Sequence, residues 1–448
     1  MKRKFVTIYT VPEVTNKGYM LTVQPCQEGV YFEKDKPIRF DVSLTKEGNP
    51  CSEGELYAYF NWNSEKVLWH RFLDHENGTS SIDFTCEWSG FGNLHVLFYL
   101  GDEEILEQIR GIAVSPDMLK RSYPCPDDFD SFWNEKKKTI DVPFKAEYTP
   151  IDETSHPELH DFSHKTLIER DHSAVDIHDV QVDCPAGNVS GILTRPKERK
   201  SKSLPALLFL HGAGVRPCEP GHFVGQAARG VMVFDMNAHG IPNDKPQEWY
   251  RELQENGRLK DYQYFGIESR ETFYFLNMYL RVKRGLDFLK NLEEWDGKIL
   301  VAMGCSQGSA QAFAGSYLEP QVTAVVGTSL AYGDLTGFLC GRKVNFIEWL
   351  KMGPRGRMDR NILNVAPYFD TVNFLRNYHG ALCAALGVLD QGCLPTTNYV
   401  SISECPADAT VILQSDCYHA VSPQAEEMTW DFVFEHIGKK EVISDQSH

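Results

Sequence analysis

The chain has 448 residues, of which 42% are hydrophobic and 12% aromatic, and this length and composition predict two or three folded domains. Its net charge of −17 argues against nucleic acid and against an anionic membrane surface as partners. No run of about 18 apolar residues is present, which excludes a membrane-spanning helix within this sequence.

The first four residues, Met-Lys-Arg-Lys, resemble the start of a signal peptide, but residues 5–12 alternate like a strand and lack the apolar core of a leader. The 12 cysteines are scattered and form no C-x-x-C pair, and several lie inside apolar runs. We therefore expect no metal site, no cofactor and a cytoplasmic, reducing location. A periplasmic or secreted location is the alternative if a leader has been removed.

Residues 1–117 are predicted to form an all-β sandwich of immunoglobulin-like size. Turn signals such as Asn77-Gly78 separate short segments of strand-forming residues. The expected strands include residues 5–11, 19–23, 38–44, 55–62, 80–85 and 93–99. A proline-rich segment near residue 124 follows, and residues 127–140 have the pattern of a helix.

Residues 118–448 are predicted to form a second domain, because the pattern changes to alternating strands and helices. Near-continuous apolar runs are typical of parallel strands that are covered on both faces. The runs are residues 204–210, 231–236, 299–303, 322–328, 382–389 and 410–414. The longest expected helix, residues 271–292, has an apolar stripe that we interpret as core packing. This part of the chain is therefore expected to be an α/β domain with a mostly parallel sheet.

The sequence Gly-Cys-Ser-Gln-Gly at residues 304–308 lies between an apolar strand and a helix of small residues. A G-x-S-x-G sequence in this position is the nucleophile elbow of α/β-hydrolases, in which a sharp turn exposes the serine hydroxyl. Glycines are needed on either side because a side chain there would collide with the neighbouring strand and helix. We therefore predict an α/β-hydrolase fold with Ser306 as the nucleophile.

A serine nucleophile needs a base and an acid that orients the base, and in this fold they follow in the order acid, then histidine. Asp390 ends one apolar run, and His419 follows the next. Order, spacing and position at strand ends predict Asp390 as the acid and His419 as the base. Asp416, in the loop of His419, and Asp370, which precedes its strand, are alternatives that rank below Asp390.

Two backbone N–H groups are predicted to stabilise the oxyanion of the tetrahedral intermediate. One belongs to Gln307, the residue after the nucleophile. The other is assigned to Ala213, in the loop after the strand of residues 204–210, where Gly212 and Gly214 let the backbone turn its amides inward. The alternative is a glycine-rich turn without a catalytic role.

Residues 118–448 resemble the carbohydrate esterase family that contains acetyl xylan esterases and cephalosporin C deacetylases. The resemblance rests on residues 127–133, 272–287, 304–308 and 368–373, the last leading to the strand end Gly-Val-Leu-Asp at 387–390. Carried over to these positions, it implies Ser306, Asp390 and His419 as the triad, with Gln307 and Ala213 as the oxyanion hole. It also implies hydrolysis of small acyl esters such as acetate, with acetylated xylo-oligosaccharides as expected substrates.

The chain departs from this family around the mouth of the site. The family's tyrosine after the first His-Gly is Ala213 here, its Arg-Gly-Gln-Gly loop is replaced by residues 237–240, and the β domain is an addition. Insertions at residues 241–267 and 338–366 are long enough to cover the site. Their aromatic residues suit either stacking on sugar rings or packing of the insertions: Trp249, Tyr250, Tyr262, Tyr264, Phe265, Phe346 and Trp349.

Two other functions compete with the esterase interpretation. A peptidase of the prolyl-oligopeptidase kind has the same fold, but it usually carries a propeller domain far larger than residues 1–117 can form. A glycan-binding protein with an inactive hydrolase body is disfavoured by the complete triad. The expected partner is a small-molecule or oligosaccharide ester. The ring-like assemblies of compact family members imply a homo-oligomer, unless the added domain blocks those contacts.

Overall fold

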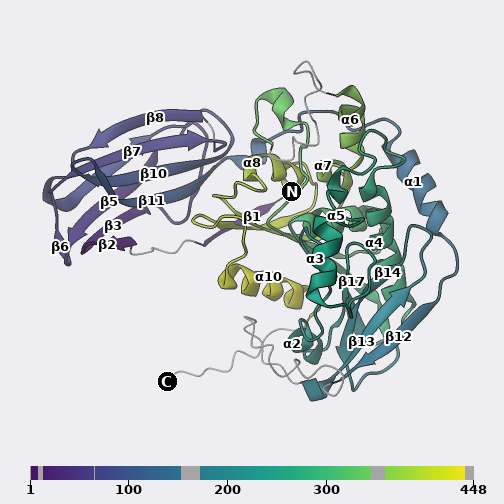
Figure 1. The fold of residues 1–448 in the computed structure, drawn as a ribbon. Coiled ribbons are helices and arrows are strands. Elements are labelled where there is room, and N and C mark those ends of the chain that lie inside the picture. Colours follow the sequence, from purple (N-terminus) through teal and green to yellow (C-terminus); the bar gives the residue numbers. More distant parts are fainter. Residues whose placement is uncertain (1, 9–13, 65, 153–171, 345–358, 439–448) are drawn as a thin grey trace.

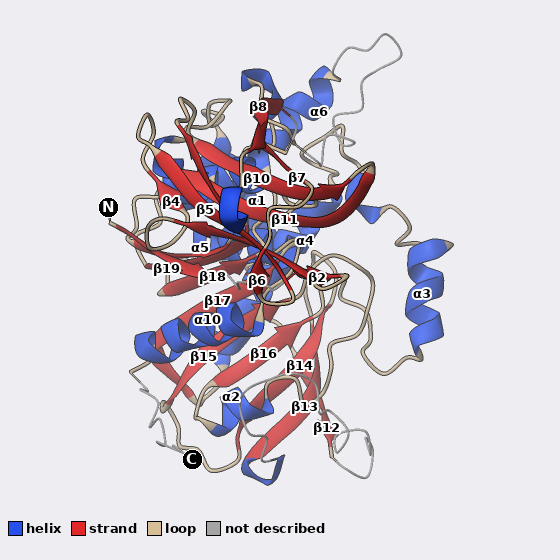
Figure 2. Ribbon diagram, turned by 90° about the vertical axis from the view of Figure 1, so that its left-hand side faces the viewer, coloured by secondary structure: helices blue, strands red, loops and turns tan. Residues whose placement is uncertain are grey.

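The computed structural model describes residues 2–8, 14–64, 66–152, 172–344 and 359–438. A β-sandwich lies beside a layered body of helices and strands (Figure 1), and a view turned by 90° places the sandwich in front of the body's central sheet (Figure 2). Phe346 and Trp349 lie outside the described residues, as does the end of the expected strand 5–11. No helix within the described ranges is long and apolar enough to cross a membrane.

The body is built on a ten-stranded sheet in the order β1-β20-β19-β18-β17-β15-β16-β14-β13-β12. Neighbours from β1 to β16 pair in parallel, and those from β16 to β12 are antiparallel. The bounds along this order are Arg3–Ile8, Ala409–Gln414, Ala381–Gly387, Ala324–Thr328, Trp295–Cys305, Leu204–Leu210, Met232–Met236, Val189–Pro196, Val175–Val182 and Ala146–Ile151. All six parallel strands predicted for the α/β domain are thus present in one sheet.

Helices cover both faces of this sheet, which explains the near-continuous apolar runs. Within β15, Leu208 belongs to a core cluster with Leu286 of α4 (Tyr274–Asn291), whereas its neighbour Leu207 clusters with Trp430 of α10 (Pro423–His436) on the opposite face. The helices, from α1 to α10, are Phe129–Ile140, Val224–Ala228, Gln247–Glu255, Tyr274–Asn291, Gln307–Leu318, Arg360–Val365, Thr371–Leu375, Pro395–Asn398, Val400–Ser403 and Pro423–His436. This is the α/β-hydrolase architecture expected from the nucleophile elbow.

The sandwich consists of two sheets with a shared apolar core. One has the order β4-β11-β10-β7-β8, and the other β2-β3-β5-β6 with β9 paired to β5. The bounds of β2 to β11 are Val14–Asn16, Tyr19–Pro25, Tyr31–Phe32, Ile38–Lys46, Asn49–Pro50, Glu55–Trp62, Lys66–Leu73, Thr79–Phe84, Gly90–Leu100 and Glu103–Val114. The sandwich contains two long strands, β8 and β11, that the turn pattern did not predict.

The first strand of the expected sandwich lies elsewhere. β1 pairs in parallel with β20 at the edge of the ten-stranded sheet, with Arg3 opposite Ala409. The Arg3 guanidinium donates hydrogen bonds to the carbonyl oxygens of Ala407, Ile402 and Cys405. The assignment of the whole of residues 1–117 to the sandwich is therefore wrong for β1. Its alternating pattern is equally suited to an edge strand of either sheet, and the pairing with β20 and the Arg3 bonds to three carbonyl groups place it in the body.

The sandwich contacts the body at the ends of β19 and β20. Gly111 of β11 exchanges hydrogen bonds with Ser415: its N–H donates to the Ser415 carbonyl at 2.8 Å, and its own carbonyl accepts from the Ser415 hydroxyl at 2.9 Å. A Cβ atom at Gly111 would lie 2.5 Å from Val388 Cβ. The Phe91 N–H also donates to Thr396 Oγ1 at 3.1 Å. The two parts of the chain are thus in close contact beside the strand ends.

Gly111→Ala is expected to destabilise the protein, because the added methyl group overlaps Val388 and the Ser415 carbonyl. Overpacking of this kind costs about 1–3 kcal/mol. Thermal unfolding measures the loss, with Val67→Ala, on an exposed position of β8, as the control that changes stability by less than about 0.5 kcal/mol. An unchanged melting temperature for Gly111→Ala would contradict this close contact.

Candidate active site

Ser306 occupies a strained turn between β17 and α5. Its backbone angles are φ 55° and ψ −122°, a conformation that costs free energy for a residue with a side chain. Hydrogen bonds hold it there: the Ser306 N–H donates to the Thr328 carbonyl at 2.9 Å, and the Ser309 N–H donates to the Ser306 carbonyl at 2.8 Å. This is the predicted nucleophile elbow.

The two glycines of the elbow are required by close contacts. A Cβ atom at Gly304 would lie 2.1 Å from the Gly308 carbonyl oxygen, and one at Gly308 would lie 1.9 Å from the Leu210 carbonyl oxygen. Neither contact is tolerable for a side chain, so α5 approaches the sheet this closely only with glycine at both positions. The steric reason given from the sequence is confirmed.

Ser306, His419 and Asp390 form one chain of hydrogen bonds. The Ser306 hydroxyl lies 3.0 Å from His419 Nε2, and His419 Nδ1 lies 2.7 Å from Asp390 Oδ2. Asp390 is buried, whereas His419 is exposed at the surface. The hydrogen bond to Asp390 raises the pKa of His419, and partial burial opposes this effect. The structure brings the three predicted residues together at distances suited to proton transfer.

Adjacent parallel strands deliver the acid and the base to the same edge of the sheet. Asp390 follows β19 and His419 follows β20, and the loops after these strands are bonded to each other. The Val388 N–H donates to the Gln414 carbonyl at 2.9 Å, and the Leu389 N–H donates to the Cys417 carbonyl at 3.0 Å. These backbone bonds fix the distance between the two loops and hence between the two side chains.

The alternative acids are placed differently. Asp370 caps α7, and its carboxylate accepts hydrogen bonds from the N–H groups of Asp334, Leu335 and Val372. Burial, with the nearby charge of Asp334, raises the pKa of Asp370 to about 7. Asp416 lies in the loop of His419, but the Nδ1 partner of His419 is Asp390. The geometry thus favours Asp390 over Asp370 and Asp416 as the acid that orients His419.

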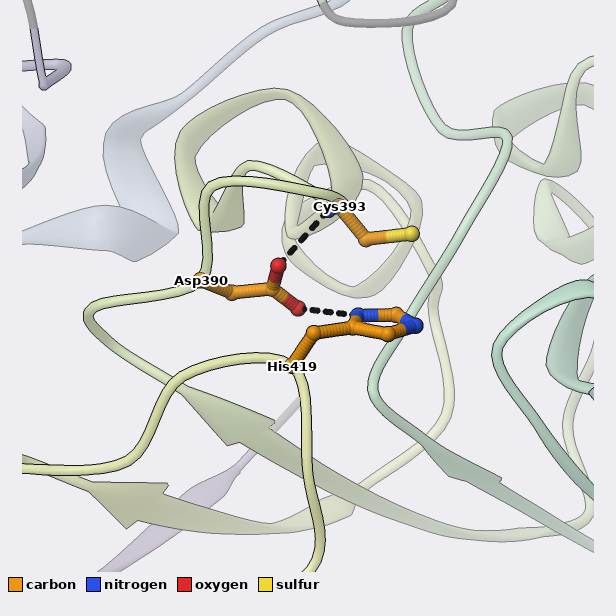
Figure 3. Close-up of side chains that lie close together, drawn as sticks. All are labelled: Asp390, Cys393 and His419. Atoms are coloured by element: carbon orange, nitrogen blue, oxygen red, sulfur yellow. Dashed lines mark hydrogen bonds and ion pairs between the residues drawn. The ribbon is translucent and has the colours of Figure 1, made fainter.

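Cys393 lies beside the acid and the base, and these three residues could in principle hold a metal ion (Figure 3). Both oxygens of Asp390 already have donors, because Oδ1 accepts from the N–H groups of Gly392 and Cys393, and Oδ2 binds His419. Burial raises the pKa of the Cys393 thiol far above its usual range, so the thiolate that a metal requires is disfavoured. The cluster is suited to orienting His419 rather than to binding a metal.

The predicted oxyanion donors lie on either side of Ser306. Gln307 is the first residue of α5, and the early N–H groups of a helix have no partner within the helix. The loop of Ala213 lies next to the nucleophile: a Cβ atom at Gly212 would be 3.4 Å from Ser306 Cβ, and Gly214 has a φ of 114°. The positions of both segments next to Ser306 are compatible with the predicted role of these two amides as oxyanion donors.

Tyr262 connects the two oxyanion segments, a role that the sequence did not reveal. Its hydroxyl donates to Gln307 Oε1 at 2.6 Å and accepts from the Gly214 N–H at 3.4 Å. The only signal in the sequence was its membership of the aromatic insertion 241–267. Tyr262 and Tyr250 are buried, whereas Phe265 is partly exposed, so the two buried tyrosines pack the insertion against the body.

His239, within the segment that replaces the family's Arg-Gly-Gln-Gly loop, supports the same region. Its ring binds the Gly214 carbonyl at 3.2 Å and the Tyr274 hydroxyl at 2.9 Å. Burial lowers the pKa of His239 to about 3 and that of His211 to about 4. Both rings are therefore neutral hydrogen-bonding groups at physiological pH, and they add no positive charge beside the oxyanion loop.

A cleft of about 550 Å³ opens at Ser306 and His419. Polar and charged side chains contribute much of its wall: Arg216, Glu219, His222 and Asp235, together with His211. His222 Nδ1 lies 3.5 Å from Asp235 Oδ2. The nucleophile therefore faces a solvent-accessible space with both polar and apolar walls, in which charged side chains can bind a hydroxyl-rich molecule.

The sequence matches the family model for acetyl xylan esterase over residues 117–435. It is 27% identical over 368 residues to the acetyl esterase Axe7A of Xylanibacter ruminicola, covering 79% of this chain and 77% of that protein. The fold is similar to that of acetyl xylan esterase from Paenibacillus sp. R4, with a TM-score of 0.59 and 21% identity over 71% of this chain and 98% of the other. Acetyl xylan esterase 1 from Thermoanaerobacterium sp. JW/SL YS485 gives a TM-score of 0.59 and 19% identity, over 71% and 97%.

Asp390→Asn is expected to lower kcat by about 10³–10⁴-fold, because the amide no longer stabilises the protonated His419 or its correct tautomer. Only neutral His419 accepts the serine proton, so activity is lost as the pH falls through its pKa. In the native protein, kcat/KM is expected to fall on the acidic side with a pKa above the ordinary histidine value of 6.5. In the variant this pKa is expected to be lower, because the carboxylate that raises it is gone. Asp416→Asn is the control and leaves kcat and the pKa of the acidic side of the profile nearly unchanged. The reverse outcome would make Asp416 the acid.

Tyr262→Phe is expected to lower kcat by about 10-fold with little change in KM, because both oxyanion segments lose a common hydrogen-bonding partner. A boronic acid that mimics the tetrahedral intermediate should bind more weakly by the same factor. Tyr250→Phe, which removes a hydrogen bond to the Pro242 carbonyl in the same insertion, is the matched control. Equal kinetics in the two variants would show that Tyr262 only packs the insertion.

Proposed function

The chain belongs to the acetyl xylan esterase family, a family of carboxylic ester hydrolases, and we propose that it removes acetyl groups from xylan-type oligosaccharides with Ser306, His419 and Asp390 as its catalytic triad. The observation that carries the proposal is the hydrogen-bond chain from the Ser306 hydroxyl through His419 to Asp390, with Ser306 and His419 lining a cleft. An esterase needs this arrangement, since a neutral serine is a poor nucleophile without an oriented base.

The reaction begins when the Ser306 hydroxyl attacks the carbonyl carbon of the acetyl ester. His419 Nε2 accepts the serine proton, and Asp390 stabilises the imidazolium that results. The carbonyl oxygen becomes an oxyanion, which the N–H groups of Gln307 and Ala213 stabilise. Collapse of this intermediate breaks the bond to the sugar oxygen, which leaves with the proton of His419. An acetyl group remains on Ser306.

A water molecule completes the cycle. Neutral His419 takes a proton from the water, and the resulting nucleophile attacks the acetyl carbonyl on Ser306. The same two amides stabilise the second oxyanion. The intermediate releases acetate, and the Ser306 oxygen recovers its proton from His419. The residues of the chain account for each proton in both halves of the reaction.

The substrate class is supported by the walls of the cleft and by the relatives. Arg216 and Glu219 are exposed beside Ser306 and offer hydrogen-bond partners for sugar hydroxyls. The related proteins are described as an acetyl esterase and as acetyl xylan esterases. Acetylated xylo-oligosaccharides combine both features, a small acyl group and a polar, hydroxyl-rich leaving group.

Acetate release from a panel of acetylated oligosaccharides is the direct test. We expect release from acetylated xylo-oligosaccharides, and Ser306→Ala should lower kcat by about 10⁶-fold while leaving the fold intact. Ser316→Ala, in the helix that follows Ser306 and with a hydroxyl that donates to the Phe313 carbonyl, is the matched control and should remain active.

Two outcomes would contradict the proposal. Hydrolysis of long-chain acyl esters without acetate release from any sugar would change the substrate class. Cleavage of an aminoacyl-proline amide in preference to acetate esters would instead make the chain a peptidase.

A further inference from the structure

One face of the sandwich carries exposed aromatic rings. Along β7, Leu56, Ala58 and Phe60 are buried in the sandwich core, and the residues between them, Tyr57 and Tyr59, point to the other face and are partly exposed. The neighbouring strand β8 presents His70 opposite Tyr59 and Phe72 opposite Tyr57. We name Tyr57, Tyr59, His70 and Phe72 the aromatic platform.

The rings of the platform contact one another. Tyr57 lies 5.3 Å from Phe72, 5.9 Å from His70 and 6.2 Å from Tyr59, measured between ring centroids. Tyr59 in turn stacks on His95 of β10 at 4.2 Å. Phe72 is 66% exposed, the highest value among the large apolar side chains of the described residues. An exposed, contiguous aromatic surface of this kind is typical of a binding site.

Hydrogen bonds hold the inner edge of the platform in place. His95 Nδ1 lies 2.8 Å from Glu107 Oε1, and the Asn61 amide lies 3.1 Å from His95 Nε2. The ring under Tyr59 is therefore fixed on both sides before any ligand arrives. A preformed surface loses little conformational entropy on binding.

The turn that joins the two strands of the platform contacts the loop after Asp390. The Gln391 side chain, directly after the acid Asp390, donates to Ser64 Oγ at 2.9 Å in the turn between β7 and β8. Two residues along each strand separate successive side chains on one face, about 7 Å per step. Asn61 lies near the end of β7 that reaches this turn. Along the strand and away from the turn, Tyr59 is about 7 Å and Tyr57 about 14 Å from Asn61. The exposed residues Gln391 and Tyr418, the latter next to His419, lie on the body's side of the junction.

From this placement we propose that the aromatic platform binds the neutral polysaccharide chain whose acetyl esters reach Ser306, so that the sandwich is a substrate-binding module of the esterase. The inference rests on the proposed function. Aromatic rings stack on the apolar faces of pyranose rings, while the exposed side chains of His70 and Gln391 offer hydrogen bonds to hydroxyl groups. The net charge of −17 and the nearby Glu107 disfavour a polyanionic chain.

The test compares a polymer with a small ester. The double variant Tyr57→Ala/Phe72→Ala should lower kcat/KM on acetylated xylan by about 10-fold, because two stacking contacts are lost. Its kcat/KM on a chromogenic acetate should stay within about twofold of the native value, because Ser306, His419 and Asp390 are unchanged. Tyr148→Ala, a tyrosine 42% exposed on β12 at the opposite edge of the body's sheet, is the matched control.

Binding is measured separately from catalysis by electrophoresis of Ser306→Ala protein through gels that contain xylan, a β-linked glucan or a mannan. Retardation by xylan that disappears in the platform variant supports the proposal. Three outcomes would each overturn the proposal. The platform variant could lose kcat/KM equally on the polymer and the small ester, or xylan could fail to retard the Ser306→Ala protein. The platform variant could also change only the oligomeric state in gel filtration. Failure of the proposed function can be told apart from failure of this proposal. In that case the native protein would release no acetate, even if xylan retarded its band in the gel.

Discussion

The close approach of α5 to the sheet is the contact on which the whole site depends. It is possible because Gly304 and Gly308 lack side chains where the nearest backbone atoms leave no room for a Cβ. The approach brings the N-terminus of α5 against the end of β15, so the Gln307 amide and the loop of Ala213 lie on either side of the nucleophile. The strain at Ser306 is a consequence of the same turn, and the bonds to Thr328 and Ser309 maintain it.

The acid and the base depend on a second contact, which links three parts of the chain. Backbone bonds join the loops after β19 and β20, and Gly111 of the sandwich rests on Val388 and Ser415 within those loops. β1 adds to this connection, because the chain starts in the body's sheet beside β20 before it enters the sandwich. The sandwich is therefore anchored on both sides of the strand that precedes His419. Displacement of the sandwich would act directly on the residues that position the triad.

The catalytic residues could be predicted because their signals are local. Ser306, Asp390 and His419 each follow a buried apolar run, and the chain order of the fold then assigns their roles. Pairings between distant segments leave no such signal. The alternation of β1 does not indicate which sheet it joins, and β11 begins with glutamates that resemble a turn. β8 was missed because its outer face is exposed, which hid the aromatic platform as well.

The structure shows which contacts are made by the segments that depart from the family at the mouth of the site. The loop of Ala213 is supported although residues 237–240 differ from the family. The His239 ring binds the Gly214 carbonyl, and the Tyr262 hydroxyl accepts a hydrogen bond from the Gly214 N–H. The loop is thus held by side chains from two other segments, while Ala213 itself presents only a methyl group toward the cleft. Changes in sequence at this rim therefore act on the oxyanion loop as well as on the space that a substrate enters.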